Sequence, residues 1–367
     1  MELGEGDMSA SRTPWWAWLW PLSAWAVLLA TAFAGASGII IAAAGAALLA
    51  TVFAAVHHAE VVAHRTGEPF GTLVLAVAVT VIEVALIVSV MVTAHAEKTA
   101  LPRDTVFAAI MIVCNGIVGL CLFWGGARHR EQGFQVHGAS AALAVLAALS
   151  TLTLVLPNAA TSLPGPAFSN SQLLFAGIIS LVLYGAFVFV QTVRHRDYFL
   201  PVGADADDAH APPPSNATAL ISLGLLLVSL VAVVGLAKAL TPTLEVGLAW
   251  LAVPKAVVGI VIAGLVLLPE GLAAVRAARA NRLQTSLNLA LGSALASIGL
   301  TIPAVAAVSL ALGKPPLELG LDEKGLVLLA LTLLVGVITL GTGRTTVLQG
   351  IVHLVIFAAF LFFAVVP

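Results

Sequence analysis

Long apolar stretches separated by short polar segments run along almost the whole chain. A helix that crosses a membrane needs about 20 consecutive, predominantly apolar residues, and eleven stretches come close to that length. They span residues 15–35, 38–63, 69–94, 105–126, 138–157, 170–193, 217–240, 246–275, 285–312, 325–341 and 345–366. The pattern predicts an all-α polytopic membrane protein with about eleven transmembrane helices.

The eighth stretch is too long to cross a bilayer upright. At about 1.5 Å per residue, its roughly thirty residues would extend about 45 Å, against about 30 Å of hydrocarbon. We therefore expect this segment to tilt or to break. Pro254, Pro269 and Gly271 offer places for a break, because proline and glycine interrupt the helical hydrogen bonds.

The composition agrees with a membrane protein. Hydrophobic residues make up 60% of the chain and charged residues 9%, whereas soluble domains contain about 25% charged residues. The formal net charge of −2 gives no indication of a nucleic-acid partner, so the expected surroundings are a lipid bilayer. Residues 1–13 are polar, and the apolar run that follows them predicts a spanning helix rather than a cleavable signal peptide.

Basic residues are distributed unequally between the two predicted sides of the membrane. With the N-terminus inside, ten arginines fall in the inner segments and five basic residues fall in the outer loops. The positive-inside rule therefore favours a cytoplasmic N-terminus in a plasma (inner) membrane.

One polar stretch, RHRDYFLPVGADADDAHAPPPSN (194–216), stands apart from the others. It contains three aspartates followed by three prolines and is typical of an extended cytoplasmic linker. Five spans follow it, and one leading span plus five precede it. Because an odd number of spans reverses the orientation of a repeat, we expect two inverted five-helix repeats. The expected parts are a tail with the leading helix (1–37), a first repeat (38–195), the acidic, proline-rich linker (196–216) and a second repeat (217–367).

One glutamate interrupts the second span in each half of the chain. Glu83 lies within TLVLAVAVTVIEVALIVSVMV, and Glu270 lies within VVGIVIAGLVLLPEGLAAV. A carboxylate near the centre of a spanning helix costs roughly 2.5–3.5 kcal/mol on insertion scales, so such a residue usually has a function. The matched positions predict a cation site near the membrane midplane, at the interface of the two repeats.

Neutral oxygens near the two carboxylates would complete the coordination of a cation. Ca²⁺ takes about six to eight oxygen ligands, of which two carboxylates supply up to four. Thr80 shares a helix face with Glu83, and Ser293 and Ser297 present one polar face because they are four residues apart. Asn115 and Asn288 are further polar groups in the spans that follow each glutamate, and carbonyl groups freed near Pro269 are another expected source.

The same carboxylates predict coupled exchange. Protons and Ca²⁺ compete for the same oxygens. A protonated pair or a Ca²⁺-bound pair can cross the region of low dielectric constant, whereas two bare carboxylates cannot cross cheaply. Two protons would then replace one Ca²⁺.

A group of histidines marks the predicted cytoplasmic end of the second span. His57, His58, Glu60 and His64 lie there, but their spacing does not match H-E-x-x-H. A solvated helix end, a proton or cation antechamber, and a metal site are the three interpretations that this pattern leaves open. His353, in the last span, is expected to be a hydrogen-bonded packing residue.

Two long segments resemble the calcium/cation antiporter superfamily. AAVHHAEVVAHRTGEPFGTLVLAVAVTVIEVALI is similar to its first signature region, with wording closest to the bacterial ChaA-type calcium/proton antiporters. LLPEGLAAVRAARANRLQTSLNLALGSALASIGLTIP is similar to its second signature region. The resemblance implies an eleven-span fold with one leading helix and two inverted repeats, a bacterial plasma membrane, and exchange of cytoplasmic Ca²⁺ for external protons.

The resemblance also implies roles for individual residues. Glu83 and Glu270 match the family's acidic cation ligands, Asn115 matches the polar residue of the helix after the first motif, and Gly292 and Ser293 match the Gly-Ser of the helix after the second. Many calcium/proton exchangers have Gly-Asn-Ala before each glutamate, whereas this chain has Thr80 and Leu267 where the amides are expected. These departures bear on ion selectivity, and the ChaA type is associated with Na⁺ and K⁺ as well as Ca²⁺.

The sequence therefore leads to the hypothesis of a secondary transporter, not an enzyme, that uses no cofactor and carries Ca²⁺ and H⁺ as substrates. Exchange of Na⁺ or K⁺ for protons on the same fold is the alternative within transport. An intramembrane metalloenzyme that uses the His57, His58, Glu60 and His64 cluster is the alternative of a different class.

Overall fold

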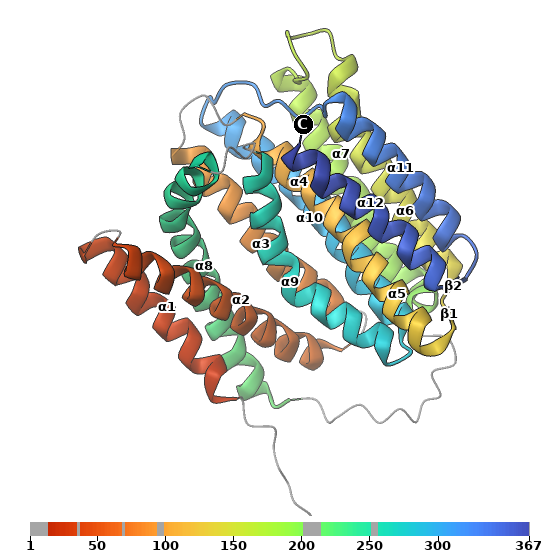
Figure 1. Cartoon of the computed structure of the whole chain (residues 1–367), viewed down its shortest axis with the longest axis horizontal. Helices are drawn as coiled ribbons and strands as arrows, with labels where there is room; N and C mark the ends of the chain where they lie inside the picture. Colours follow the sequence, from red (N-terminus) through yellow and green to blue (C-terminus); the bar gives the residue numbers. More distant parts are fainter. Residues whose placement is uncertain are drawn as a thin grey trace, which may run out of the picture.

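A computed structural model of the chain describes residues 14–34, 37–67, 70–93, 99–200, 214–250 and 256–366. These residues are almost entirely helical (Figure 1). The α-helices are α1 (Trp15–Ala34), α2 (Gly38–Thr66), α3 (Phe70–Thr93), α4 (Leu101–Met111), α5 (Val118–His129), α6 (Val136–Ser150), α7 (Asn170–Phe189), α8 (Asn216–Trp250), α9 (Ala256–Arg279), α10 (Leu283–Ala311), α11 (Glu323–Leu340) and α12 (Val347–Val365).

Short elements of other kinds extend or join these helices. Two short strands pair antiparallel and connect the ends of α5 and α12. They and the tighter or wider helical turns are β1 (Glu131–Gly133), β2 (Arg344–Thr346), the π-helical η2 (Ile112–Ile117), η3 (Thr151–Val155) and η5 (Val190–Arg194), and the 3₁₀ turns η4 (Leu156–Ala159) and η6 (Arg196–Phe199). Because η2 joins α4 to α5 without a break, residues 101–129 form one span.

Ten of the described helices are long and apolar enough to cross a membrane, and a shorter apolar helix, Ala76–Val88, lies within α3. Together they correspond one to one with the eleven stretches found along the sequence. The prediction of an all-α polytopic membrane protein is confirmed.

The seventh and eighth predicted spans have different boundaries in the structure. α8 continues to Trp250, so residues 246–250 belong to the same helix as the seventh span, and α9 is described from Ala256 onward. Pro254 lies outside the described residues. α9 runs without interruption through Pro269 and Gly271, so the helix does not break at either of these two places. A proline inside a membrane helix is tolerated where neighbouring helices compensate for the lost hydrogen bond.

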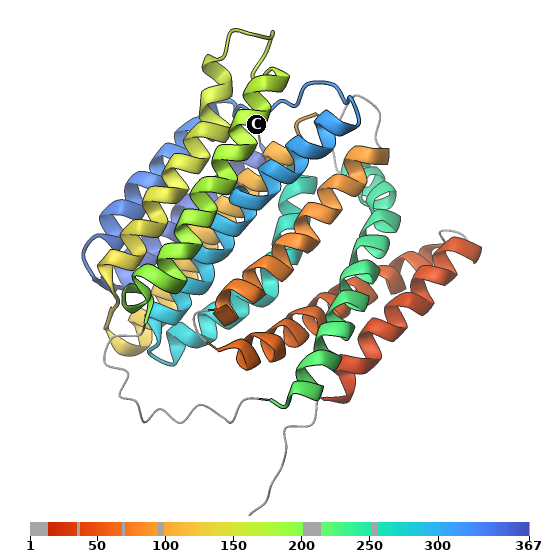
Figure 2. The same ribbon diagram turned by 180° about the vertical axis from the view of Figure 1, so that it is seen from behind.

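The helices form two packed units. One hydrophobic cluster joins α1, α2 and α8 with parts of α3 and α9, and a larger cluster joins α4 to α7 and α10 to α12 with other parts of α3 and α9. Figures 1 and 2 show α1, α2 and α8 as a separate group, with α3 and α9 between that group and the remaining helices. α3 and α9 therefore lie at the boundary between the two units.

α10 is the central element of the larger unit and contacts α3, α6, α7 and α9. Its approach to α7 is unusually close at Gly299, where a Cβ atom would lie 2.7 Å from the Cβ atom of Tyr184. Only a residue without a side chain fits this position. The close approach holds the Tyr184 ring against α10.

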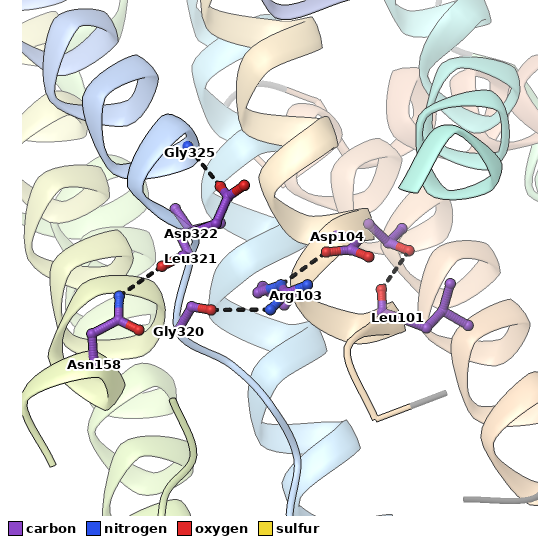
Figure 3. Close-up of polar contacts among 9 residues, drawn as sticks. Leu101, Arg103, Asp104, Asn158, Gly320, Leu321, Asp322 and Gly325 are labelled. Carbon is purple, nitrogen blue, oxygen red and sulfur yellow. Dashed lines mark hydrogen bonds and ion pairs between the residues drawn. The ribbon is translucent and has the colours of Figure 1, made fainter. Parts of the chain in front are cut away.

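The loop before α11 is held by polar contacts at the end of the molecule where α4 begins. Figure 3 shows Arg103 between Asp104, which it meets at 2.8 Å, and the carbonyl oxygen of Gly320, to which it donates a hydrogen bond of 3.1 Å. The side chain of Asn158 donates to the carbonyl oxygen of Leu321 at 2.8 Å. These contacts tie α4, the turn after α6 and the loop before α11 to one another.

Candidate cation site

The two glutamates lie near the middles of α3 and α9, the helices between the packed units. Glu83 is 2% exposed and Glu270 is 4% exposed. Both helices are otherwise strongly apolar over their length. Two carboxyl groups are therefore buried where the two units of the molecule meet.

α10 brings these two carboxyl groups together. Ser297 donates a hydrogen bond to Oε2 of Glu83, and Ser293 donates one of 2.5 Å to Oε2 of Glu270. Residues four apart on a helix lie on one face with about 5–6 Å between their Cβ atoms. The carboxyl groups of α3 and α9 thus meet adjacent turns of one helix face.

One carboxylate oxygen of this pair is left without a partner. Oε1 of Glu83 is buried and accepts no hydrogen bond from the described residues. A buried oxygen that has lost water and gained no partner is destabilising by about 1–3 kcal/mol, and by more when it is charged. A proton or a cation at this oxygen would remove that penalty.

Thr80 and Leu267 lie one turn before each glutamate. Thr80 is buried, and its hydroxyl group donates to the carbonyl oxygen of Ala76 at 2.8 Å. Its oxygen keeps a lone pair on the same helix face as Glu83. Leu267 is 2% exposed and supplies no polar atom from its side chain. The two halves of the site therefore differ in their supporting oxygens.

Asn115 makes its hydrogen bonds away from the two carboxyl groups. Its amide nitrogen donates to the hydroxyl oxygen of Thr332 at 2.8 Å, and its amide oxygen lies 3.2 Å from Nδ1 of His353. Nε2 of His353 lies 3.2 Å from the hydroxyl oxygen of Thr339. His353 is a buried, hydrogen-bonded packing residue, as predicted. The structure does not join Asn115 to either glutamate by a hydrogen bond.

A cavity reaches Glu270 from one end of the molecule. Gly292 lies on its wall, and a Cβ atom at Gly292 would meet nothing within 4 Å. The lining residues are Leu73, Ala76, Tyr184, Phe187, Gln191, Glu270, Asn288, Leu289 and Gly292. They run from the middle of α9 to the end of α7 and the first turns of α10, which is the end of the molecule where the linker starts, at η6. Glu83 is not among the described residues that line this cavity.

The histidine cluster does not converge on one point. His57 lies against the Trp16 ring, with 5.0 Å between centroids, and Nε2 of His58 lies 2.9 Å from the carbonyl oxygen of Ala17. Glu60 and His64 are exposed. The described residues contain no group of three or more His, Cys, Asp or Glu side chains placed to hold a metal ion. The metal-site interpretation of this cluster is wrong, because two of its members turn toward α1 instead.

Tyr184 and Gln191 were not predicted from the sequence, although both line the cavity. Gln191 is 7% exposed and lies in the π-helical turn η5. The one signal in the sequence was an amide near the end of stretch 170–193, whose other amides, Asn170 and Gln172, lie at its start. Without a motif around it, such an amide does not by itself indicate a functional site.

A protein-family comparison covers most of the chain. The profile of the family described as sodium/calcium exchanger protein matches residues 17–193 and 221–366. These two ranges include both glutamates and both serines of the site.

Two similar proteins of known designation are bacterial. The chain is 52% identical over 367 residues to the putative ionic transporter y4hA of Sinorhizobium fredii, covering 98% of this chain and 99% of that protein. It is 38% identical over 317 residues to the sodium-potassium/proton antiporter ChaA of Escherichia coli, covering 86% and 85% of the two chains.

Solved structures share the fold at low sequence identity. The H⁺/Ca²⁺ exchanger CAX superposes with a TM-score of 0.72 at 14% identity, covering 94% of this chain and 88% of that one. Native YfkE superposes with a TM-score of 0.69 at 15% identity, covering 96% and 100%. At these identities the likeness concerns the arrangement of the helices alone.

Proposed function

This chain belongs to the sodium/calcium exchanger protein family, and on that premise we propose that it exchanges cytoplasmic Ca²⁺ for external protons at Glu83 and Glu270. Members of the family are transporters, so the alternative of an intramembrane metalloenzyme is wrong. The chain is a multi-pass membrane protein with bacterial relatives.

The observation that carries the proposal is the pair of buried carboxyl groups on adjacent turns of α10. Two carboxylates neutralise one Ca²⁺, and two protons neutralise the same pair. An uncompensated charge at the membrane centre is strongly unfavourable. The protein therefore changes conformation readily only when the pair is occupied, and this restriction couples the two fluxes.

The position of the site at the boundary of two packed units supports alternating access. α1, α2 and α8 form a unit that can rock against the remaining helices, with α3 and α9 at the boundary. The cavity that Glu270 lines lies toward the end where the linker starts, at η6, and polar contacts join α4 to the loop before α11 at the other end. With a cytoplasmic linker and N-terminus, this arrangement faces the cytoplasm.

The division into repeats 38–195 and 217–367 belongs to the same proposal. Glu83 and Glu270 occupy corresponding places in the two ranges, each on the second helix. Both side chains bind to one helix, α10, which lies in the second range.

Exchange of Na⁺ or K⁺ for protons is a second candidate. Its support is the 38% identity to ChaA, a sodium-potassium/proton antiporter, together with the small number of neutral side-chain oxygens near the carboxyl groups. The Thr80 hydroxyl group is engaged with Ala76, and Leu267 offers no oxygen. A monovalent cation needs only one carboxylate charge, so the other carboxyl group would keep its proton.

Proton movement in proteoliposomes tests the proposal. Ca²⁺, Na⁺, K⁺ and Mg²⁺ are supplied one at a time, and the internal pH is followed with a fluorescent indicator. Proton movement driven by Ca²⁺ supports the first candidate, and movement driven by Na⁺ or K⁺ alone supports the second. If no cation drives proton movement in vesicles that contain inserted protein, antiport is refuted.

A further inference from the structure

Two buried polar side chains on α7 and η5 line the cavity without using their hydrogen-bonding groups. Tyr184 and Gln191 are each 7% exposed, and both line the cavity that ends at Glu270. Neither makes a side-chain hydrogen bond to another described residue. Their polar atoms are not among the fully buried atoms that lack a partner, so they border the open space of the cavity, where a solvent molecule or an ion can reach them.

The side chain of Asn288, across the cavity on α10, has a fixed orientation. The backbone N–H of Gln135 donates to the amide oxygen of Gln284, so the amide nitrogen of Gln284 faces Asn288 and donates to its Oδ1 at 2.9 Å. The amide nitrogen of Asn288 in turn donates to the carbonyl oxygen of Phe199 at 2.6 Å. Oδ1 of Asn288 therefore keeps one lone pair for a further partner.

The remaining cavity wall favours a cation over an anion. None of the described residues that line it is lysine, arginine or histidine, and the one ionisable carboxyl group among them is that of Glu270. A second, adjoining cavity shares Gln191, Asn288 and Gly292 with the first and is likewise free of basic side chains among its described lining residues. Neutral amide oxygens followed by a carboxylate form a gradient of increasing attraction for a metal cation.

We propose that Gln191 and Asn288 form a second cation site, which holds a partly dehydrated metal cation between the linker-side surface and Glu270. This inference rests on the proposed antiport and adds a step to it. The amide of Gln191 has no fixed orientation and can turn its oxygen toward the ion, while Oδ1 of Asn288 supplies a second neutral oxygen and water fills the other coordination positions. The cation exchanges part of its water shell there before it meets a charged ligand.

The two glutamates then act in order from this side. Glu270 lines the cavity, whereas Glu83 is closed behind Ser297 and is not among the described lining residues. A cation released from the neutral site reaches Glu270 first and Glu83 second. Substitution of Gln191 should therefore affect transport of a cation that enters from the linker side, and not of one that enters from the opposite side.

Sided transport measurements on Gln191→Leu test this assignment. Leucine keeps a similar size and removes the amide. Right-side-out and everted vesicles are prepared, and their orientation is read from an impermeant thiol reagent on an Ala204→Cys background. The KM for the cation offered from the linker side should rise about tenfold, the effect of losing one polar contact to a charged ion. The KM from the opposite side and Vmax should be unchanged.

Two further variants complete the test. Val193→Leu, in the same turn but 63% exposed, is the matched control and should leave both KM values unchanged. Gln191→Glu should lower the KM for a divalent cation from the linker side only, because a carboxylate attracts the ion more strongly than an amide. This variant decides the matter if Gln191→Leu is not inserted into the membrane.

The outcomes separate this inference from the proposed function. The second site is overturned, and antiport stands, if the unsubstituted protein exchanges normally but the Gln191 variants change neither KM. The same holds if they change the KM from the linker side and the KM from the opposite side equally. Absence of any cation-driven proton movement in the unsubstituted protein overturns antiport and the second site together.

Discussion

Replacing each buried glutamate by glutamine isolates the role of its charge. Glutamine has the same length as glutamate, and its amide oxygen still accepts the hydrogen bond that Ser297 or Ser293 now donates. At Glu83 the amide nitrogen would take the place of Oε1, an atom that already lacks a partner among the described residues. We therefore expect insertion and folding to survive Glu83→Gln and Glu270→Gln, with stability changed by about 1 kcal/mol or less.

The effect on exchange should be far larger. With one carboxylate left, a bound Ca²⁺ carries one uncompensated charge through the middle of the membrane. Insertion scales place the cost of such a charge at about 2.5–3.5 kcal/mol, which corresponds to a loss of roughly 60- to 300-fold in rate. Insertion scales give lower costs for a charge at the membrane centre than other estimates do. The true loss is therefore expected to be larger, and exchange should fall to background in either variant.

The assay is cation-driven proton movement in vesicles, with the amount of inserted protein measured in parallel. Glu83→Asp and Glu270→Asp serve as controls, because aspartate keeps the charge and withdraws it by about one carbon–carbon bond, roughly 1.5 Å. The aspartate variants should retain weakened exchange. Apparent Ca²⁺ affinity in the unsubstituted protein should fall as the pH is lowered, since protons occupy the same oxygens. Near-normal exchange by either glutamine variant would refute a shared-carboxylate mechanism.

Three other predictions concern selectivity, access and topology. Thr80→Asn, which adds an amide next to Glu83, should increase the preference for Ca²⁺ over Na⁺ and K⁺ about tenfold in competition assays; an unchanged ratio would show that backbone oxygens or cavity size set selectivity. Gly292→Val should fill open space in the cavity and slow exchange severalfold while leaving thermal stability within about 1 kcal/mol, and unimpaired exchange would show that ions take another route. A cysteine at Ala204, in the part of the linker that lies outside the described residues, should be labelled in everted vesicles and not in intact cells; labelling from outside would reverse the assigned direction of transport.

Much of this protein could be predicted from local sequence patterns. The eleven apolar stretches identify the membrane class, because each spanning helix must satisfy its backbone hydrogen bonds internally and bury its side chains in lipid or protein. The places of Glu83 and Glu270, and the shared face of Ser293 and Ser297, follow from hydropathy and helical periodicity within single segments. These features need no knowledge of how the segments pack.

Partners that come from distant helices could not be predicted in this way. Ser297 reaches Glu83 across 214 residues of chain, and Asn115 meets His353 across 238. Asn115 could have joined the carboxyl groups or, as observed, the α11–α12 interface. Which of these contacts Asn115 makes depends on how η2 is rotated against its neighbouring helices. The residue pattern within 112–117 does not determine that rotation.

The place of Gln191 at the cavity could not be predicted from the sequence, for the same reason. Helical periodicity places an amide on a face, but a π-helical turn changes which way that face points. The close approach of α7 to α10 at Gly299 then decides which side chains border the cavity. The amino-acid sequence alone determined that this chain crosses the membrane and carries two buried carboxyl groups. Only the packing of α3, α7, α9 and α10 decided that these groups meet on one helix face, and that Glu270 alone of the two borders the described cavity. Contacts between helices depend on the position and rotation of each helix, and not on its own residues alone.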